Sequence, residues 1–259
     1  MRITLLLLSV IPVILSGCNF SGDGDRFRKK IYGANLAGGH GVPKVSRLIH
    51  SIQSTLPPPM NLEIKEHFHQ FEGGGTLRWL ESGASGKTTI VLFHGATFRA
   101  ELWQKLGTMR FFALRGFRTI STDLPRHGKS TNVHFSKSEF LPHLLKVIYS
   151  DHPVLMGHSF AGSYLFPYLT RHPESVGAVI LVAPTGILEY RSDLHNVTAP
   201  SLIIWGENDE MISVQQASLL EHLLPNAQLH TLKKARHECY LTAPEEFHTT
   251  IYNFLRQHL

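Results

Sequence analysis

Beyond about Asn61 the chain alternates between two kinds of hydrophobic pattern. Helical periods lie between compact apolar runs that show no polar alternation, which is typical of strands buried on both faces of a parallel sheet. Because strand and helix alternate, the sequence predicts a doubly wound alpha/beta fold with helices on both faces of a mostly parallel sheet. The six apolar runs are TTIVLFHG, FRTISTDLP, HPVLMGHS, VGAVILVAP, SLIIWGEND and AQLHTL.

Three segments at the edges of this pattern carry signals of their own. Two short segments, NLEIKEHFHQF and TLRWLESG, flank glycines 73–75 and predict a hairpin of two strands. One helical face stops at Gly116, a candidate C-terminal cap, and carries Leu102, Leu106, Met109 and Ala113. The last helix has Pro244 in its first turn, and its apolar face carries Phe247, Ile251, Phe254 and Leu255.

The N-terminal residues have the shape of an export signal. MRITLLLLSVIPVILSGC starts with a single basic residue, continues as an apolar run too short for a comfortable membrane span, and ends in small residues. Its last four residues, LSGC, resemble the bacterial lipobox, which predicts lipidation of Cys18. We expect a signal at residues 1–18, a Gly- and Pro-rich flexible linker at 19–60 and one globular domain at 61–259.

The predicted signal leaves three destinations open. Lipidation of Cys18 would make the protein a membrane-anchored lipoprotein of the periplasm or cell envelope. A plain cleaved signal would make it a secreted protein, and an uncleaved signal would anchor it in the membrane.

Composition narrows the possible partners. The chain has 259 residues, of which 42% are hydrophobic and 17% charged, enough for one sizeable domain. Its net charge of +5 is scattered apart from residues 26–30, so a linker beside a membrane surface is a better interpretation than nucleic-acid binding. Two cysteines exclude a disulfide framework and a four-cysteine zinc site. His67 and His69 share a strand face without an evident third ligand, so no metal site is predicted.

Three residues at predicted strand ends occur in the order Ser, Asp, His. Ser159 ends the strand PVLMG and opens a helix, Asp209 follows SLIIWGEN, and His237 follows AQLHTLKKAR, a strand and short loop before the last helix. A serine becomes a nucleophile when a histidine takes its proton and an acid orients that histidine. Each residue alone is a weak signal, because such residues also occur in turns, caps and surfaces. Together they predict a catalytic triad on an alpha/beta-hydrolase fold.

Two backbone amides are predicted to form an oxyanion hole. Acyl transfer builds negative charge on the carbonyl oxygen of the substrate, and fixed N–H groups stabilise it. One donor would be the amide of Phe160, directly after the serine, and the other that of Ala96 in the loop HGATF, with Thr97 as the alternative. His94 in the same loop is expected to brace the loop rather than to act as acid or base.

The turn around the serine departs from the usual pattern G-x-S-x-G, because Ala161 stands at the second glycine. That glycine allows helix and strand to pack closely behind the nucleophile. Gly157 and Gly162 keep the neighbourhood small, and a methyl group is the smallest possible addition. We therefore expect the exchange to affect strain at the turn more than catalysis.

Two long segments carry a resemblance to a known family. ELWQKLGTMRFFALRGFRTISTDLPRHGKS and ARHECYLTAPEEFHTTIYNFL resemble the alpha/beta-hydrolase domain-containing protein 14 family, of the CCG1-interacting factor B type. The resemblance extends from about Asn61 to the C-terminus and implies that Ser159, Asp209 and His237 are the triad. It also implies a small hydrolase of short acyl esters, in a family with one branch that moves acetyl groups from lysine to coenzyme A.

The predicted site is open. The segment from Pro184 to Ser201 is too short for the helical lid that many hydrolases of this fold insert there, which predicts small acyl groups as substrates. Several side chains are candidates to line the site, although a core or surface position is equally open for each: Phe98, Trp103, His127, Phe160, Met211 and Tyr240.

The sequence thus predicts a serine hydrolase that cleaves small, acetyl-like esters or amides without a cofactor. One alternative is transfer of the acyl group to a thiol such as coenzyme A, which export of the protein would disfavour. The other is a catalytically silent hydrolase fold that serves as a binding module.

Overall fold

The structure is a computed structural model that describes residues 62–85 and 87–259. The predicted signal at 1–18, the linker at 19–60 and Cys18 lie outside the described residues. Within the part of the chain that is described, no helix is long and apolar enough to cross a membrane.

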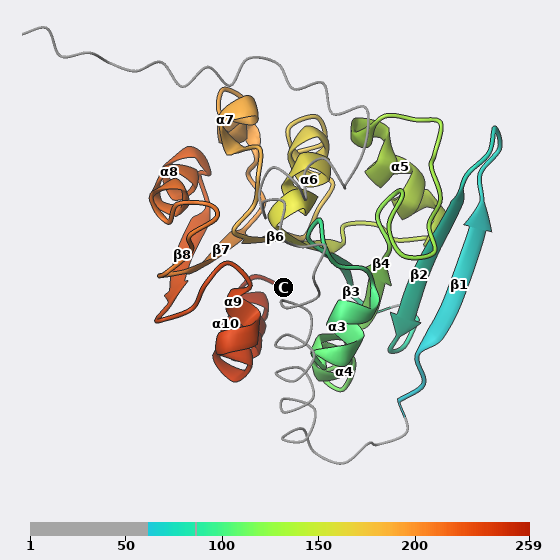
Figure 1. Cartoon of the computed structure of the whole chain (residues 1–259), viewed down its shortest axis with the longest axis horizontal. Coiled ribbons are helices and arrows are strands. Elements are labelled where there is room, and N and C mark those ends of the chain that lie inside the picture. The colour runs from blue at the N-terminus through green and yellow to red at the C-terminus, as the bar shows by residue number, and fades with distance from the viewer. Residues whose placement is uncertain (1–61, 86) are drawn as a thin grey trace, which may run out of the picture.

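A single eight-stranded sheet forms the centre of the described domain (Figure 1). Its strand order is β1-β2-β4-β3-β5-β6-β7-β8. Strands β3 to β8 are parallel to one another, and β2 pairs antiparallel with both β1 and β4. The strands are β1 (Lys65–Gln70), β2 (Thr76–Ser82), β3 (Thr89–Phe93), β4 (Arg118–Thr122), β5 (Val154–His158), β6 (Ala178–Val182), β7 (Ser201–Gly206) and β8 (Ala227–Leu232).

This sheet confirms the predicted strands. Each of the six apolar runs contains one parallel strand, and the two segments around glycines 73–75 form the predicted hairpin, in which Lys65 lies opposite Glu81 and Gln70 opposite Thr76. Every residue of β3, β5, β6 and β7 is buried, as expected for strands covered on both faces.

Helices cover both faces of the sheet. In Figure 1, α5 to α8 lie on one side of the strands and α3, α4, α9 and α10 on the other. The first group is α5 (Lys137–Val147), α6 (Gly162–Leu169), α7 (Ile187–Tyr190) and α8 (Gln215–Leu223). The second is α3 (Glu101–Lys105), α4 (Thr108–Ala113), α9 (Cys239–Thr242) and α10 (Pro244–His258).

The core consists of two hydrophobic clusters, one on each face of the sheet. The larger cluster packs α5, α6, α7 and α8 through residues such as Leu144, Leu165 and Leu220. The other packs α3, α4, α9 and α10, and it includes Trp103 and Tyr240. The predicted apolar face of the last helix is buried there as well, with Phe247, Ile251, Phe254 and Leu255.

Two elements differ from the sequence expectation. The helical face that was predicted to continue to Gly116 is broken between α3 and α4 at Gly107, whose φ of 81° lies in the left-handed region that glycine adopts without steric cost. Strand β8 is only partly buried, because it lies at the edge of the sheet and pairs with β7 alone.

The winding of the chain through the sheet reverses beside β3. Strand β4 pairs with one edge of β3, and the next strand, β5, pairs with its other edge. The direction in which the chain winds through the sheet therefore reverses at β3. In open alpha/beta sheets, ligands bind at the carboxyl ends of the strands at such a point. The segments that follow β3 and β5 border this point, and those that follow β7 and β8 leave the parallel sheet at the same end.

The connection between β6 and β7 is compact. It holds only the four-residue helix α7 and a 3-10 turn at Leu194–Asn196. This agrees with the fold class that the sequence predicts, an alpha/beta hydrolase without a substantial lid inserted at this point.

Candidate active site

Ser159 lies in a strained turn at the end of β5. Its φ of 52° places a residue with a side chain in the left-handed region, which costs on the order of 1–3 kcal/mol. Such strained residues cluster at active sites. The backbone then forms a 3-10 turn, Ser159–Ala161, and enters α6. The carbonyl oxygen of Ser159 accepts hydrogen bonds from the amide of Thr185 at 2.9 Å and from its hydroxyl at 3.2 Å. The loop after β6 therefore holds the strained turn in place.

Glycines make room for Ala161. A Cβ atom at Gly157 would lie 2.9 Å from the Ala161 methyl carbon and would also collide with the side chain of Leu165. A Cβ atom at Gly162 would collide with the carbonyl oxygen of Thr185. Because Gly157 has no side chain, the methyl group of Ala161 fits into the core with no exposed surface. The departure from G-x-S-x-G is accommodated by packing, as the sequence suggested.

The structure brings Asp209 and His237 together. Asp209 follows β7 and His237 follows β8, and the His237 Nδ1 lies 2.8 Å from the Asp209 Oδ2. The other carboxylate oxygen accepts hydrogen bonds from the amides of Met211 at 2.8 Å and Ile212 at 2.9 Å. Because the carboxylate is an acceptor, we assign the imidazole proton to Nδ1. The backbone therefore fixes the acid, and the acid fixes the orientation of the imidazole.

The second nitrogen of His237 has no hydrogen-bond partner among the described residues, although the atom is buried. Buried polar atoms without a partner are uncommon and need an explanation. With the proton on Nδ1, this Nε2 carries a lone pair and can accept a proton. The ring as a whole is only 3% exposed, so bulk water has little access to it.

The loop after β3 lies against the serine turn. A Cβ atom at Gly95 would be 3.6 Å from the Ser159 Cβ and 2.7 Å from the His158 Nδ1, so only a glycine fits there without displacing the ring. Ala96, the predicted oxyanion donor, is the next residue and is buried. The loop thus brings the backbone at Ala96 beside the serine turn that contains Phe160, the other predicted donor.

His94 braces this loop. Its Nδ1 donates to the carbonyl oxygen of Gly95 at 2.8 Å, and its Nε2 accepts from the amide of Leu124 at 3.0 Å. Burial, together with the nearby His127, lowers the pKa of His94 to about 3. Both nitrogens are engaged and the ring stays neutral, which agrees with the predicted structural role.

The candidate lining residues separate into two groups. Phe98, His127, Phe160 and Met211 are partly buried. The His127 ring lies 5.7 Å from that of Phe160, and its Nε2 is 3.1 Å from the carbonyl oxygen of Ala96, so these residues adjoin the predicted oxyanion donors.

Trp103 and Tyr240 form the second group, and for them the structure favours the core position that the sequence left open. Neither side chain has any exposed surface, and their rings pack 5.0 Å apart within the core cluster of α3, α4, α9 and α10. A side chain without exposed surface does not line a substrate pocket in this structure.

Three nearby residues were not identified from the sequence. Thr185 binds the carbonyl of Ser159, as described above. Lys137, at the start of α5, places its Nζ 4.7 Å from the centre of the Phe160 ring. His158 is buried beneath Gly95 and touches the ring of His237. His158 stands at the variable position before the serine, where the motif gives no signal for a role.

Comparisons with known proteins identify the family of the chain. The model of the alpha/beta hydrolase family matches residues 90–193. Protein ABHD14A of Danio rerio is 34% identical over 172 residues, which cover 64% of this chain and 63% of that protein. The "Putative protein-lysine deacylase ABHD14B" of Homo sapiens is 32% identical over 187 residues, which cover 68% of this chain and 87% of that protein.

The chain belongs to the ABHD14-type alpha/beta-hydrolase family. Solved structures agree on the fold. A CIB-like hydrolase from Thermoplasma acidophilum superposes with a TM-score of 0.72 at 22% identity, over 76% of this chain and all of that one. The carboxylesterase CesB from Bacillus subtilis superposes with a TM-score of 0.68 at 17% identity, over 84% of this chain and 99% of that one. The alpha/beta-hydrolase fold predicted for the ABHD14-type chain is confirmed.

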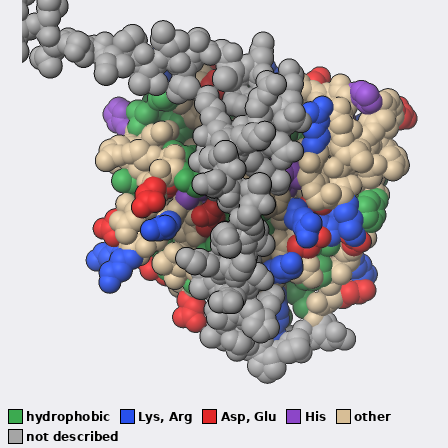
Figure 2. Space-filling view, viewed as in Figure 1, with side chains coloured by type: hydrophobic (Ala, Val, Ile, Leu, Met, Phe, Trp, Pro, Cys, Tyr) green, Lys and Arg blue, Asp and Glu red, His purple; other side chains and the backbone are tan. Residues whose placement is uncertain are grey.

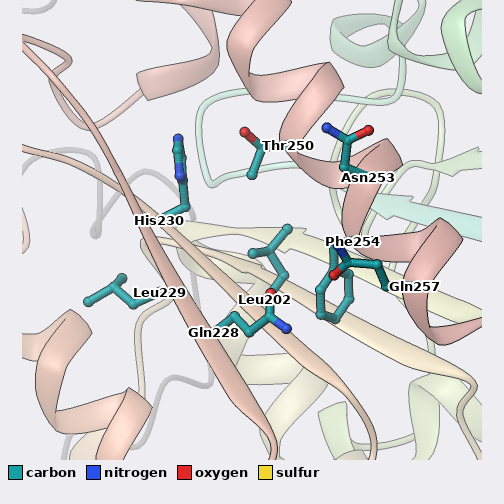
Figure 3. A pocket seen from close by; sticks show the side chains of 8 residues that line it. All are labelled: Leu202, Gln228, Leu229, His230, Thr250, Asn253, Phe254 and Gln257. Atoms are coloured by element: carbon teal, nitrogen blue, oxygen red, sulfur yellow. The ribbon is translucent and has the colours of Figure 1, made fainter.

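A groove elsewhere on the domain does not belong to this site. It has a volume of about 250 Å³ and lies between β7, β8 and α10, with Leu202, Gln228 and Phe254 in its lining (Figure 3). Leu202 and Gln228 lie at the amino-terminal ends of their strands, whereas Asp209 and His237 follow the carboxyl-terminal ends. The groove therefore lies toward the end of the sheet where the parallel strands begin, opposite the end that carries Asp209 and His237.

No cluster of three or more His, Cys, Asp or Glu side chains that could hold a metal ion occurs in residues 62–85 and 87–259. His67 instead stacks on Trp79, with ring centres 5.1 Å apart, and the His69 ring contacts Phe71. On the face shown in Figure 2, basic and acidic side chains of the described residues are interspersed.

Proposed function

We propose that this hydrolase cleaves small, acetyl-like acyl esters or amides through a covalent acyl-enzyme on Ser159. The observation that carries the proposal is the Asp209–His237 pair, with its 2.8 Å hydrogen bond and a buried His237 Nε2 that has no partner among residues 62–85 and 87–259. Ser159 lies in a strained turn at the end of β5 and would need such a base to remove its hydroxyl proton. Support also comes from the ABHD14-type alpha/beta-hydrolase family to which the chain belongs.

In the proposed first step, His237 Nε2 takes the hydroxyl proton of Ser159 while the serine oxygen attacks the acyl carbon. Asp209 orients the imidazole and stabilises its positive charge. The amides of Ala96 and Phe160 would stabilise the negative charge on the carbonyl oxygen. The bond to the leaving group then breaks, and His237 returns the proton to that group.

In the second step, water attacks the acyl-enzyme. His237 accepts a proton from the water, the bond between the acyl carbon and the serine oxygen breaks, and Ser159 regains its proton. The products are a carboxylic acid and the free enzyme. The compact connection between β6 and β7 favours small acyl groups, because it adds no large apolar wall above the site.

A fluorophosphonate probe tests the nucleophile. We expect covalent labelling of the wild-type chain and none of Ser159→Ala. Ser192→Ala is a matched control, because Ser192 is an exposed serine after α7 that is not part of the predicted triad. Absence of labelling in the wild type, or equal labelling of Ser159→Ala, would favour the silent binding module instead.

A series of model esters tests the acyl group. We expect kcat/KM to be highest for acetyl esters and to fall as the acyl chain lengthens. A strong preference for long chains would overturn the argument from the compact β6–β7 connection.

The name of the human relative favours one specific amide, an acylated lysine. Acetyl-lysine peptides, incubated with and without coenzyme A, test both this substrate and the acceptor. Release of acetate without the thiol supports hydrolysis, whereas strict dependence on coenzyme A and formation of acetyl-coenzyme A would establish the transfer alternative.

We also propose that the chain is exported and lipidated at Cys18, on the sequence evidence of the LSGC motif. Metabolic palmitate labelling in a bacterial host, present in the wild type and absent in Cys18→Ser, is the expected result. Absence of label on a processed chain would indicate plain secretion, and absence of both label and processing would favour a signal anchor.

A further inference from the structure

We infer that His158 is a positioning residue, which links the loop of the catalytic base to the serine turn and to the oxyanion loop. The inference deepens the proposed function and depends on it. Its basis is that a single buried imidazole bonds to the backbone of His237 and to the hydroxyl of Tyr240. The same ring also occupies the place that a side chain at Gly95 would need.

The hydrogen bonds of His158 define its tautomer. Its Nε2 lies 3.3 Å from the carbonyl oxygen of His237, and a carbonyl oxygen can only accept, so the proton is on Nε2. Its Nδ1 then accepts from the Tyr240 hydroxyl, which lies 3.2 Å away. The neutral ring thus uses one nitrogen as donor and the other as acceptor.

The surroundings keep the ring neutral. Burial, and next the neighbouring His237, lower the pKa of His158 well below its usual range. The groups that face it are the rings of His237 and Tyr240, with centres 4.8 Å and 5.0 Å away, and His94 adds a smaller effect. The buried phenol of Tyr240 has a role here that does not require contact with substrate.

The packing of this ring connects the segments on which the chemistry depends. His158 directly precedes Ser159, so movement of the ring moves the serine turn. Its Nδ1 lies where a side chain at position 95 would be, so the oxyanion loop rests on the same ring. Its Nε2 holds the backbone of the proposed base. Displacement of a catalytic group by about 1 Å can lower a rate 100-fold, so such a link affects catalysis without contact with substrate.

The test compares three variants of the full chain with model acetyl esters. His158→Leu removes both hydrogen bonds and is expected to lower kcat about 10- to 100-fold, with KM changed less than about twofold. His158→Gln keeps a donor near the Nε2 position and should recover most of that loss. Tyr240→Phe removes only the hydroxyl and should lower kcat by less than His158→Leu does.

The matched control is His248→Gln. His248 is another buried neutral imidazole, in α10, where its Nε2 bonds to the Thr108 hydroxyl at 2.9 Å. Its substitution should lower the unfolding midpoint without changing kcat. A merely structural role of His158 would give the same pattern as this control, and that result would refute the inference.

Failure of this inference is distinguishable from failure of the proposed function. If fluorophosphonate labels the wild type and labels His158→Leu at the same rate, the linking role is wrong while the nucleophile stands. If the wild type is not labelled, the proposed function itself is wrong. Should His158→Leu not fold, Tyr240→Phe decides the question, because it removes the hydroxyl that bonds to the His158 Nδ1. A lowered kcat with little change in KM would then support the inference, and a wild-type kcat would refute it.

Discussion

Acidification should destabilise this domain through its buried histidines. His94, His158 and His248 are all buried in the native state with lowered pKa values, about 3 for His94 and about 4 for His248, because burial penalises the charged ring. Once unfolded, each would bind a proton near its usual value of 6.5. Below that pH the unfolded state binds more protons than the native state, so the free energy of unfolding falls as the pH is lowered.

The magnitude follows from the number of protons. Each imidazole contributes about 1.4 kcal/mol per pH unit once the unfolded ring is fully protonated, so the three together contribute about 4 kcal/mol per pH unit. For His248 alone, the window runs from its unfolded value of 6.5 down to its native value of about 4, which corresponds to about 3 kcal/mol in total. The window between pH 6 and pH 5 lies above most carboxylate titrations and isolates this effect best.

Denaturant unfolding of the full chain at pH 7, 6 and 5, followed by tryptophan fluorescence, measures the slope. In His248→Gln the slope between pH 6 and pH 5 should be smaller than in the wild type by about 1 kcal/mol per pH unit. His222→Gln is the matched control, because His222 lies exposed on α8 and should leave the slope unchanged. A wild-type slope in His248→Gln would refute the reasoning.

Three further predictions concern the site and its surroundings. Gly157→Ala should destabilise the fold by about 1–3 kcal/mol, and Ala161→Gly in the same chain should recover part of that loss, as a double-mutant cycle of unfolding free energies would show. Asp209→Asn should lower kcat on the order of 10³-fold or more while esters still bind, because the imidazole loses its orienting charge; kcat near the wild-type value would remove Asp209 from the mechanism. In a Cys18→Ser chain, Cys239 should react with a thiol reagent only after denaturation, because the thiol is buried and burial raises its pKa; rapid reaction of the native chain would contradict its place in the core.

Local patterns predicted the elements well, because the signals for these elements are local. Each apolar run contains a strand, since burial on both faces requires continuous apolar sequence. The face that includes Leu106 and Met109 is buried as expected, yet Gly107 divides its helix in two. Periodicity alone does not reveal this break, because both short helices bury their apolar residues against the same cluster.

The site was predictable only where its residues lie at strand ends. Because parallel strands bring their carboxyl ends to one end of the sheet, Ser159, Asp209 and His237 were predicted to lie close together. The structure places the His237 Nδ1 2.8 Å from the Asp209 Oδ2. His158 and Tyr240 were different, because the role of each depends on contacts across 79 and 82 positions of the chain. No local pattern encodes such a contact. Tyr240 was accordingly a candidate for the pocket with a core position left open, and the structure places it in the core.

The serine turn shows why a motif can lose a glycine and keep its geometry. The requirement behind G-x-S-x-G is for space between strand β5 and helix α6, and space is a property of pairs of residues. At Gly157 and Ala161 the Cβ positions would be 2.9 Å apart if both carried a side chain, which is too close for two methyl groups. One of the two must therefore be glycine, and here it is the residue on the strand. Gly162 is under a separate constraint, because its neighbour is the Thr185 carbonyl, whose backbone cannot move without loosening the hydrogen bond that holds Ser159. A side chain at position 161 is thus tolerated because position 157 is glycine, whereas a side chain at position 162 would disturb the hydrogen bond that holds the strained serine.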